Sequence, residues 1–219
     1  YSMSNKKDTE IVCPNCKHHF KFPSYSIIEA NKDPELTQKV ANLSLFRFKC
    51  PNCGDEGELM YPFIYTDDEN KILLLFVPRT SNKTDTDDFD ELASDCMAYK
   101  KGYLFRYVND RNSFAEKLNV FYHNLDDRVI EVYKLVNHKH WNKIHPGFIN
   151  AYLMNDRKKG LCFCLFDNKE DILIEPLDKD LYQNIKDTYF YDTNLRYRDL
   201  SVVDSQWALE YLAEFKKVS

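Results

Sequence analysis

Short stretches of alternating apolar and polar residues dominate the first third of the chain. Residues 20–22 and 45–49 alternate in the way that half-buried strands do. Residues 72–77 instead form a nearly continuous apolar run that Pro78 ends, which predicts a strand buried on both faces. Together these patterns predict a small antiparallel sheet within residues 11–78.

A short helix is predicted between the first two of these strands. Asp33 can cap it, Pro34 fits the first helical position, and Glu35 places an acidic side chain in the first turn. Apolar residues then recur on one helical face, at Leu36, Val40 and Leu43. The helix is therefore expected as an insert between two strands.

Residues 79–91 read R-T-S-N-K-T-D-T-D-D-F-D-E and are almost free of apolar side chains. Such a polar, acidic stretch predicts a linker, with an ordered acidic loop as the alternative. The aspartates lack the spacing, the glycine and the final glutamate of an EF-hand loop, which argues against a calcium site.

Helical and strand periodicities alternate after this stretch, over residues 92–219. Ser113 and Glu116 form a capping box, so a helix is expected to begin there, and a second apolar helical stripe runs from Leu125 to His138. Three strands joined by turns predict an antiparallel meander at residues 148–154, 161–166 and 172–175. A short strand at residues 200–203 and a final helix from Ser205 complete the expected elements.

Two cysteine motifs interrupt the first region, Cys13-Pro14-Asn15-Cys16 and Cys50-Pro51-Asn52-Cys53. Four thiols in two C-x-x-C pairs suit one tetrahedral zinc ion. Gly54 can take the positive φ that closes such a turn, whereas Lys17 at the matching position is a poorer fit. The alternatives are two disulfides or a redox motif, but a redox C-x-x-C is expected once, beside a βαβ unit.

The predicted fold class is therefore α+β. Residues 11–78 are expected to form a four-cysteine zinc ribbon of antiparallel strands with the inserted helix, and residues 92–219 an α+β domain with helices and the meander. One structural Zn²⁺ ion is predicted to be bound by Cys13, Cys16, Cys50 and Cys53.

Composition narrows the class of protein further. The 219 residues are 43% hydrophobic and 30% charged, which is typical of a globular protein, and the net charge of −5 opposes general attraction to nucleic acid. No apolar run is long enough to span a bilayer, and residues 1–10 lack the apolar core of a secretion signal. Seven cysteines without a disulfide framework favour a reducing compartment, so a cytoplasmic location is expected.

A catalytic role for the zinc site is not indicated. A catalytic zinc keeps an open position, whereas four cysteines fill the shell. His18 and His19 follow the first motif and are alternative ligands. The motifs of P-loop enzymes, dinucleotide-binding folds, α/β-hydrolases and zinc proteases are absent, and the zinc deaminase pattern lacks its H-x-E.

A second cluster of chemistry-bearing residues lies near the end of the second predicted helix: His138, His140, Trp141, Lys143 and His145. It could be a second metal site or a basic, aromatic patch that contacts nucleic acid or a phosphorylated ligand. A solvated helix end, where cations are favoured by the helix dipole, explains the same residues. The cluster is kept as a candidate interaction site.

Several of these motifs together resemble the bacterial CpXC family. They are the two C-P-x-C motifs, Asp33-Pro34-Glu35, Tyr61-Pro62 leading into residues 73–78, and the segment N-L-D-D-R-V-I-E at residues 124–131. The end segment Trp207-Ala208-Leu209-Glu210 is similar to the family's longer members. The resemblance covers roughly residues 11–139 and implies a zinc ribbon in a bacterial protein. It implies no activity, because the family has none assigned.

Three functions remain open from the sequence. The favoured one is a non-enzymatic protein-interaction or regulatory module with a structural zinc. The second is nucleic-acid binding through Lys17, Lys21, Arg47 and Lys49 interleaved with Phe20, Phe22, Phe46 and Phe48, although the same alternation fits phenylalanines that face the ribbon's own core. The third is an unrecognised enzyme in residues 92–219. The sequence indicates neither the oligomeric state nor the partner.

Overall fold

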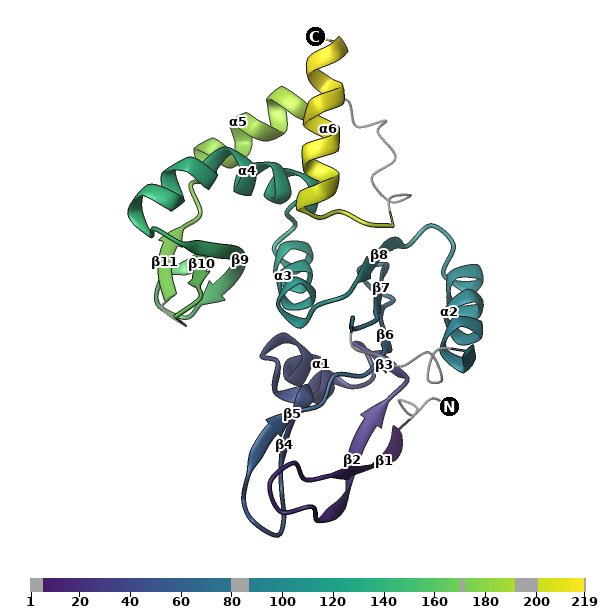
Figure 1. Cartoon of the computed structure of the whole chain (residues 1–219). Helices are drawn as coiled ribbons and strands as arrows, with labels where there is room; N and C mark the ends of the chain where they lie inside the picture. The colour runs from purple at the N-terminus through teal and green to yellow at the C-terminus, as the bar shows by residue number, and fades with distance from the viewer. Residues whose placement is uncertain (1–5, 80–86, 170–171, 192–200, 219) are drawn as a thin grey trace. The chain divides into compact units, whose positions relative to one another are not determined.

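The computed structural model describes residues 6–79, 87–169, 172–191 and 201–218 (Figure 1). The chain divides into two compact units, Tyr1–Phe114 and Ala115–Ser219, with the boundary inside helix α3 (Arg111–Tyr122). The fold is α+β, as predicted, with antiparallel hairpins and the cysteines in the first unit and helices with an antiparallel sheet in the second. No helix in the described ranges is both long and apolar enough to cross a bilayer.

Two hairpins form one end of the first unit. Strand β1 (Lys6–Val12) pairs with β2 (His19–Tyr25), and β4 (Arg47–Lys49) pairs with β5 (Glu56–Glu58). Each cysteine motif lies in the turn of one hairpin. The predicted strand at 45–49 is split, because a 3-10 turn, η1 (Ser44–Phe46), precedes β4. Two-stranded sheets of this size are marginal alone, so the hairpins need support from packing or from a bound ion.

The inserted helix α1 (Pro34–Ala41) begins where the sequence predicts and buries Leu36 and Val40. Asp33 precedes it, but its side chain makes no capping bond. Its backbone carbonyl instead accepts hydrogen bonds from the amide and the hydroxyl of Thr37. Leu43 lies beyond the helix in a left-handed conformation, so it does not continue the predicted apolar face.

A four-stranded sheet forms the core of the first unit. Its strands are β3 (Ile27–Glu29), β6 (Phe63–Asp67), β7 (Ile72–Phe76) and β8 (Leu104–Val108), in the order β3-β6-β7-β8. Every residue of β6 and β7 is buried, which confirms the prediction of a strand covered on both faces. Ile64, Leu73 and Leu75 pack on one face against helix α2 (Asp87–Tyr99).

The opposite face of this sheet is aromatic. Phe63 and Phe76 lie directly opposite each other on β6 and β7, with ring centroids 5.3 Å apart. Phe46 from η1 and Phe114 from α3 pack on them at centroid distances of 5.4 and 5.6 Å from Phe76. These four rings are fully buried, so η1 and the hairpin that follows it are anchored to the sheet by hydrophobic packing.

The predicted linker lies within the first unit. Strand β8 follows it in sequence but pairs with β7, which precedes it. Residues 80–86 lie outside the described residues, and residues 87–91 begin helix α2. The first unit therefore extends to Phe114 and not only to Pro78. Independent folding of residues 11–78 and 92–219 stays a prediction.

Helix α3 begins earlier than predicted. The Asp110 side chain accepts hydrogen bonds from the amide and the hydroxyl of Ser113, so Asp110 and not Ser113 caps the helix. An aspartate three residues before a serine is an equally good cap, and the local sequence alone does not choose between them. The helix therefore starts at Arg111, two residues before the predicted start at Ser113.

The second unit packs helices on the predicted meander. Its elements are α4 (Asp127–Ile144), β9 (Phe148–Asp156), β10 (Gly160–Asp167), β11 (Ile172–Pro176), α5 (Lys179–Tyr189) and α6 (Ser205–Val218). The strands pair in the order β9-β10-β11, which confirms the meander. The strand expected at 200–203 does not form over its described part, residues 201–203.

Candidate metal centre

The same backbone hydrogen bonds shape both cysteine turns. In each, the amide of the first cysteine donates to the carbonyl five residues later, and the amide four residues later donates to the carbonyl of that cysteine. The N–O distances are 2.9 and 3.1 Å in the first turn, and 2.8 and 2.9 Å in the second. The repeated sequence C-P-N-C thus folds into two copies of one turn, which present their sulfur atoms alike.

Both turns close through a residue with positive φ. Gly54 has a φ of 76° and Lys17 a φ of 62°. Glycine takes this conformation without penalty, whereas a lysine there is strained. The Lys17 Nζ donates to the Pro14 carbonyl oxygen at 2.9 Å, which ties the lysine side chain back over its own turn.

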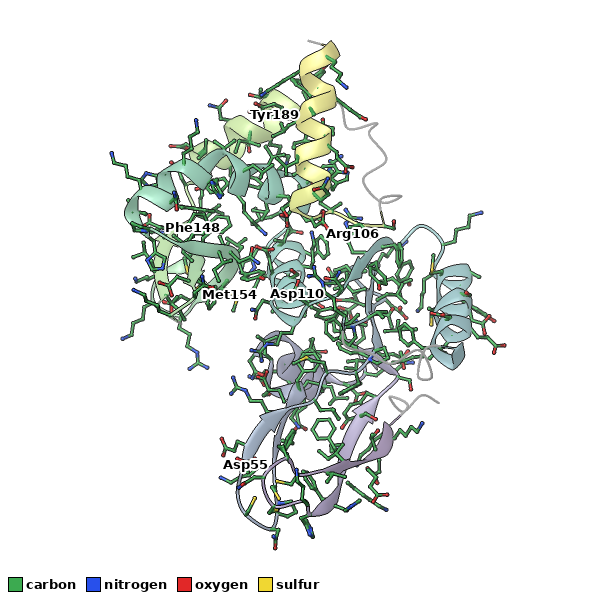
Figure 2. The ribbon with its side chains drawn as sticks, viewed as in Figure 1. Asp55, Arg106, Asp110, Phe148, Met154 and Tyr189 are labelled. Atoms are coloured by element: carbon green, nitrogen blue, oxygen red, sulfur yellow. The ribbon has the colours of Figure 1, made fainter. Side chains whose placement is uncertain are left out.

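The two turns bring the four cysteine sulfurs together. All four Sγ atoms lie within 4.8 Å of one another. Cys13 Sγ is 3.6 Å from Cys53 Sγ, and Cys16 Sγ is 3.6 Å from Cys50 Sγ. A tetrahedral zinc with Zn–S bonds of about 2.3 Å requires sulfurs about 3.8 Å apart. The sulfurs therefore have nearly the spacing of a complete ligand set, at the end of the first unit where Figure 2 labels Asp55.

Two asparagines support the cluster in a crossed arrangement. Asn52 Nδ2 lies 3.5 Å from Cys16 Sγ, and Asn15 Nδ2 lies 3.8 Å from Cys53 Sγ. Each motif thus directs its central amide at the second cysteine of the other motif. The sequence shows both asparagines, but their reach across to the opposite turn becomes visible only when the turns are placed together.

The pKa values of the clustered cysteines are shifted in opposite directions. The Asn52 side chain, and then the backbone amide of His18, lower the pKa of Cys16 to about 6. The backbone amide of Asp55 lowers the pKa of Cys53, but desolvation and the three neighbouring sulfurs outweigh it and raise this pKa to about 12. Four thiolates this close repel one another, and a bound dication would remove that repulsion and release protons.

His18 and His19 lie outside the cluster. Both are exposed, and His19 Nδ1 is 2.9 Å from Glu10 Oε1 on the paired strand. Over the described ranges, the group of side chains close enough to hold a metal ion contains cysteines only. The arrangement can bind a tetrahedral, sulfur-preferring ion and offers it no histidine.

The second candidate site is divided between the core and the surface. Helix α4 runs on to Ile144, past the predicted end at His138, and this turns Trp141 inward. Trp141 is 3% exposed and its ring packs against Phe163 and Tyr133, with centroids 5.0 and 6.2 Å away. The tryptophan is therefore part of the core of the second unit and is not offered to a ligand.

The other members of that candidate site stay near the surface. His138, His140 and Lys143 are exposed, and His145 ends the helix with Nε2 3.7 Å from Asp167 Oδ2. They form no metal-binding group with other described residues. A role of these side chains in binding a partner stays a prediction.

A buried charge network in the second unit was not predicted. Lys117 Nζ donates to Asp127 Oδ2 at 2.7 Å and to the Val203 carbonyl at 2.6 Å. Lys134 Nζ donates to Glu116 Oε2 at 2.6 Å and to Glu131 Oε1 at 3.0 Å. The apolar pattern of a helix carries no signal for a buried lysine, because its partners come from distant positions.

Burial and pairing set the protonation of this network. Burial raises the pKa of Glu116, although the Lys134 ammonium opposes the shift. Burial lowers the pKa of Lys134, but Glu116 and Glu131 outweigh it and raise the pKa overall. Since both ammonium groups and all three carboxylates have a partner, the network is accounted for by the packing of α3 and α4.

A family model described as CpXC protein matches residues 11–134, which is more than half of the chain. The matched segment contains both cysteine turns. No curated protein matches the chain, and no solved structure matches it.

Proposed function

The chain belongs to the CpXC family, and from that premise we propose that it is a non-enzymatic module that binds a partner protein. In this proposal Cys13, Cys16, Cys50 and Cys53 hold one structural Zn²⁺ ion. The observation that carries it is the set of four converging sulfurs, two from each turn, at nearly tetrahedral spacing.

The ligand set argues for a structural ion. A catalytic zinc keeps one position for water or substrate, usually beside a histidine or carboxylate ligand. Here four thiolates would occupy all four positions, and the asparagine amides approach two of the sulfurs from outside. The metal would then hold together two hairpins that are too small to be stable alone.

Zinc and iron both accept four thiolates in a tetrahedron, so the identity of the ion is part of the proposal. Zinc is favoured because it has no redox chemistry to damage its ligands and is the usual ion of two-knuckle ribbons. A colourless protein with one zinc per chain is expected. The thiols also support the proposal of a reducing, cytoplasmic setting, since no cysteine in the described residues forms a disulfide.

A partner protein is favoured over nucleic acid by the positions of the phenylalanines. Phe22 and Phe46 are 4% and 0% exposed, so half of the four rings proposed for base stacking lie in the core. The net charge of −5 also opposes a polyanion. The hairpins, fixed by the ion and by packing on the sheet, would present a rigid surface to a protein.

Metal analysis of protein purified without chelator tests the first half of the proposal. One zinc per chain is expected, and a value below about half, or iron in its place, would contradict it. Capture experiments in extract of the producing cells test the second half, with Cys50→Ala as the matched control. A partner retained at about 0.15 M salt by the native protein and not by the variant is expected. Enrichment of nothing over the variant would overturn the binding role.

A further inference from the structure

A groove of about 560 Å³ lies between the two hairpins of the first unit. Strand β2, helix α1, η1 and strand β4 line it, and we call it the hairpin groove. Its floor is apolar: Phe22, Leu36 and Leu45 are all less than a tenth exposed. Phe20 and Phe48 are half-buried and stand against each other with ring centroids 5.8 Å apart. A groove of this size suits a few side chains of a ligand.

All the charged side chains that line the hairpin groove are positively charged. Four exposed cations line it, Lys21, Lys39, Arg47 and Lys49, and none of the described residues that line it carries a carboxylate. Lys39 and Lys49 have exposed ion pairs with Glu35 and Glu56 outside the groove. Lys21 and Arg47 have no ion pair with any described residue. An apolar floor under a cationic rim is complementary to an anionic ligand that also carries an apolar group.

Two open strand edges accompany this groove. Over the described part of the chain, β2 pairs only with β1, and β4 pairs only with β5. Residues of β2 and β4 line the groove, and residues of β1 and β5 do not. Each strand therefore has one side without a neighbouring strand, and an extended chain can add hydrogen bonds to such an edge.

We propose that the hairpin groove binds an extended acidic segment of a partner protein that carries at least one apolar side chain. Successive side chains of an extended segment point in opposite directions, so apolar side chains can reach the floor while carboxylates meet the rim. This inference rests on the proposed partner-binding function and names the surface and the chemistry of the partner.

The groove fits a peptide better than single-stranded nucleic acid. Nucleic-acid binding needs aromatic faces open to the bases. The Phe22 ring is buried, and the half-buried rings of Phe20 and Phe48 pack on each other at a tilt of 58° with centroids 5.8 Å apart. Aliphatic residues and prolines supply much of the rest of the lining, which suits aliphatic or aromatic side chains of a peptide.

The test uses the full, zinc-loaded chain and fluorescein-labelled heptapeptides in which aspartate alternates with leucine, phenylalanine or valine. Fluorescence anisotropy should show binding that weakens as salt is added. Lysine-for-aspartate versions should not bind. Lys21→Glu and Arg47→Glu should each weaken binding about fivefold, the upper range for an exposed ion pair. Lys7→Glu makes the same charge change on β1, away from the groove, and should alter binding less than twofold.

Several results would overturn the proposal. They are the absence of binding by every acidic peptide at low salt, equal weakening by Lys7→Glu, or displacement of the peptides by a short oligothymidylate at lower concentration. Unchanged zinc content shows that the variants are folded. A partner captured from extract that still binds the double variant Lys21→Glu/Arg47→Glu would refute the groove and leave the proposed function standing. Peptide binding that persists after zinc is lost would contradict the structural role of the ion and leave the groove standing.

Discussion

Replacing Gly54 with alanine should weaken the metal centre without touching a ligand. Gly54 has a φ of 76°, and a Cβ placed there would meet only Lys49 Cε, at 4.0 Å. Steric overlap is therefore absent, and the whole effect comes from the backbone. A left-handed conformation costs an L-residue about 1–2 kcal/mol. Alanine recovers about 0.4–1 kcal/mol by restricting the unfolded chain. A net loss of about 1 kcal/mol is expected, or about fivefold in zinc affinity if folding of the turn is coupled to binding.

The first turn provides the mirror experiment. Lys17 has a φ of 62°, so Lys17→Gly should relieve the strain of about 1–2 kcal/mol that alanine would create at Gly54. Two effects oppose this gain. The glycine raises the conformational entropy of the unfolded chain, and the substitution removes the exposed hydrogen bond from Lys17 to Pro14, worth about 0.5 kcal/mol. The result should lie between a loss of about 0.5 kcal/mol and a gain of about 1 kcal/mol in stability, more favourable than the effect of Gly54→Ala.

Competition for zinc against a chromophoric chelator at fixed pH measures both effects. Gly102→Ala is the matched control, because Gly102 also has a positive φ, 84°, with nothing within 4 Å of its added Cβ and no part in the cysteine turns. It should lower the unfolding free energy by a similar amount and leave zinc affinity unchanged. Native zinc affinity in Gly54→Ala, or a loss of about 1 kcal/mol in Lys17→Gly, would show that the turns are not held by their positive-φ residues.

Four further outcomes follow from the structure. Chelation should expose the hairpins β1–β2 and β4–β5 to hydrogen exchange while β6 and β7 stay protected, because only the latter are buried on both faces; uniform exchange would contradict this. Zinc affinity should fall as pH is lowered, since protons compete for the thiolates, and a flat profile in a metal-buffered titration would exclude thiolate ligands. Asn52→Ala should weaken zinc binding about tenfold in the same competition assay, and Asn15→Ala less, because its amide lies farther from sulfur. Lys117→Met should lower the free energy of unfolding of the second unit by about 3–5 kcal/mol in urea denaturation, because it removes the ammonium group that lies 2.7 Å from the buried Asp127 carboxylate; a second change, Asp127→Leu, should restore much of the loss.

The local parts of this structure could be predicted from sequence. The cysteine positions, the helix after Asp33, the buried strand at residues 72–77 and the meander follow from spacing and periodicity over ten to twenty residues. Within such a window the chemistry of a turn or the face of a helix is set by near neighbours. These elements needed no knowledge of what lies elsewhere in the chain.

The parts that depend on distant partners could not be predicted. Strand β8 pairs in parallel with β7, and this pairing leaves no mark in the sequence of either segment. Trp141 was predicted as part of an interaction site, whereas α4 continues six residues past the predicted end at His138, to Ile144, and the Trp141 ring packs against Phe163. The hairpin groove forms only where the two hairpins meet, so the sequence of either hairpin alone gives no sign of it.

Because the sulfur pairs join the two cysteine turns, the metal centre can be completed only after both turns have been synthesised. Cys16 and Cys50 are 34 positions apart, and Cys13 and Cys53 are 40 positions apart. An ion shared by both turns would act as a cross-link that closes a loop containing β2, β3, α1, η1 and β4, and such closure restricts the unfolded chain much as a disulfide does. A nascent chain that has released only the first turn has two of the four thiols. Capture of the ion by all four thiols must therefore wait for the second turn to leave the ribosome, and strands β6, β7 and β8 of the sheet follow later in the chain.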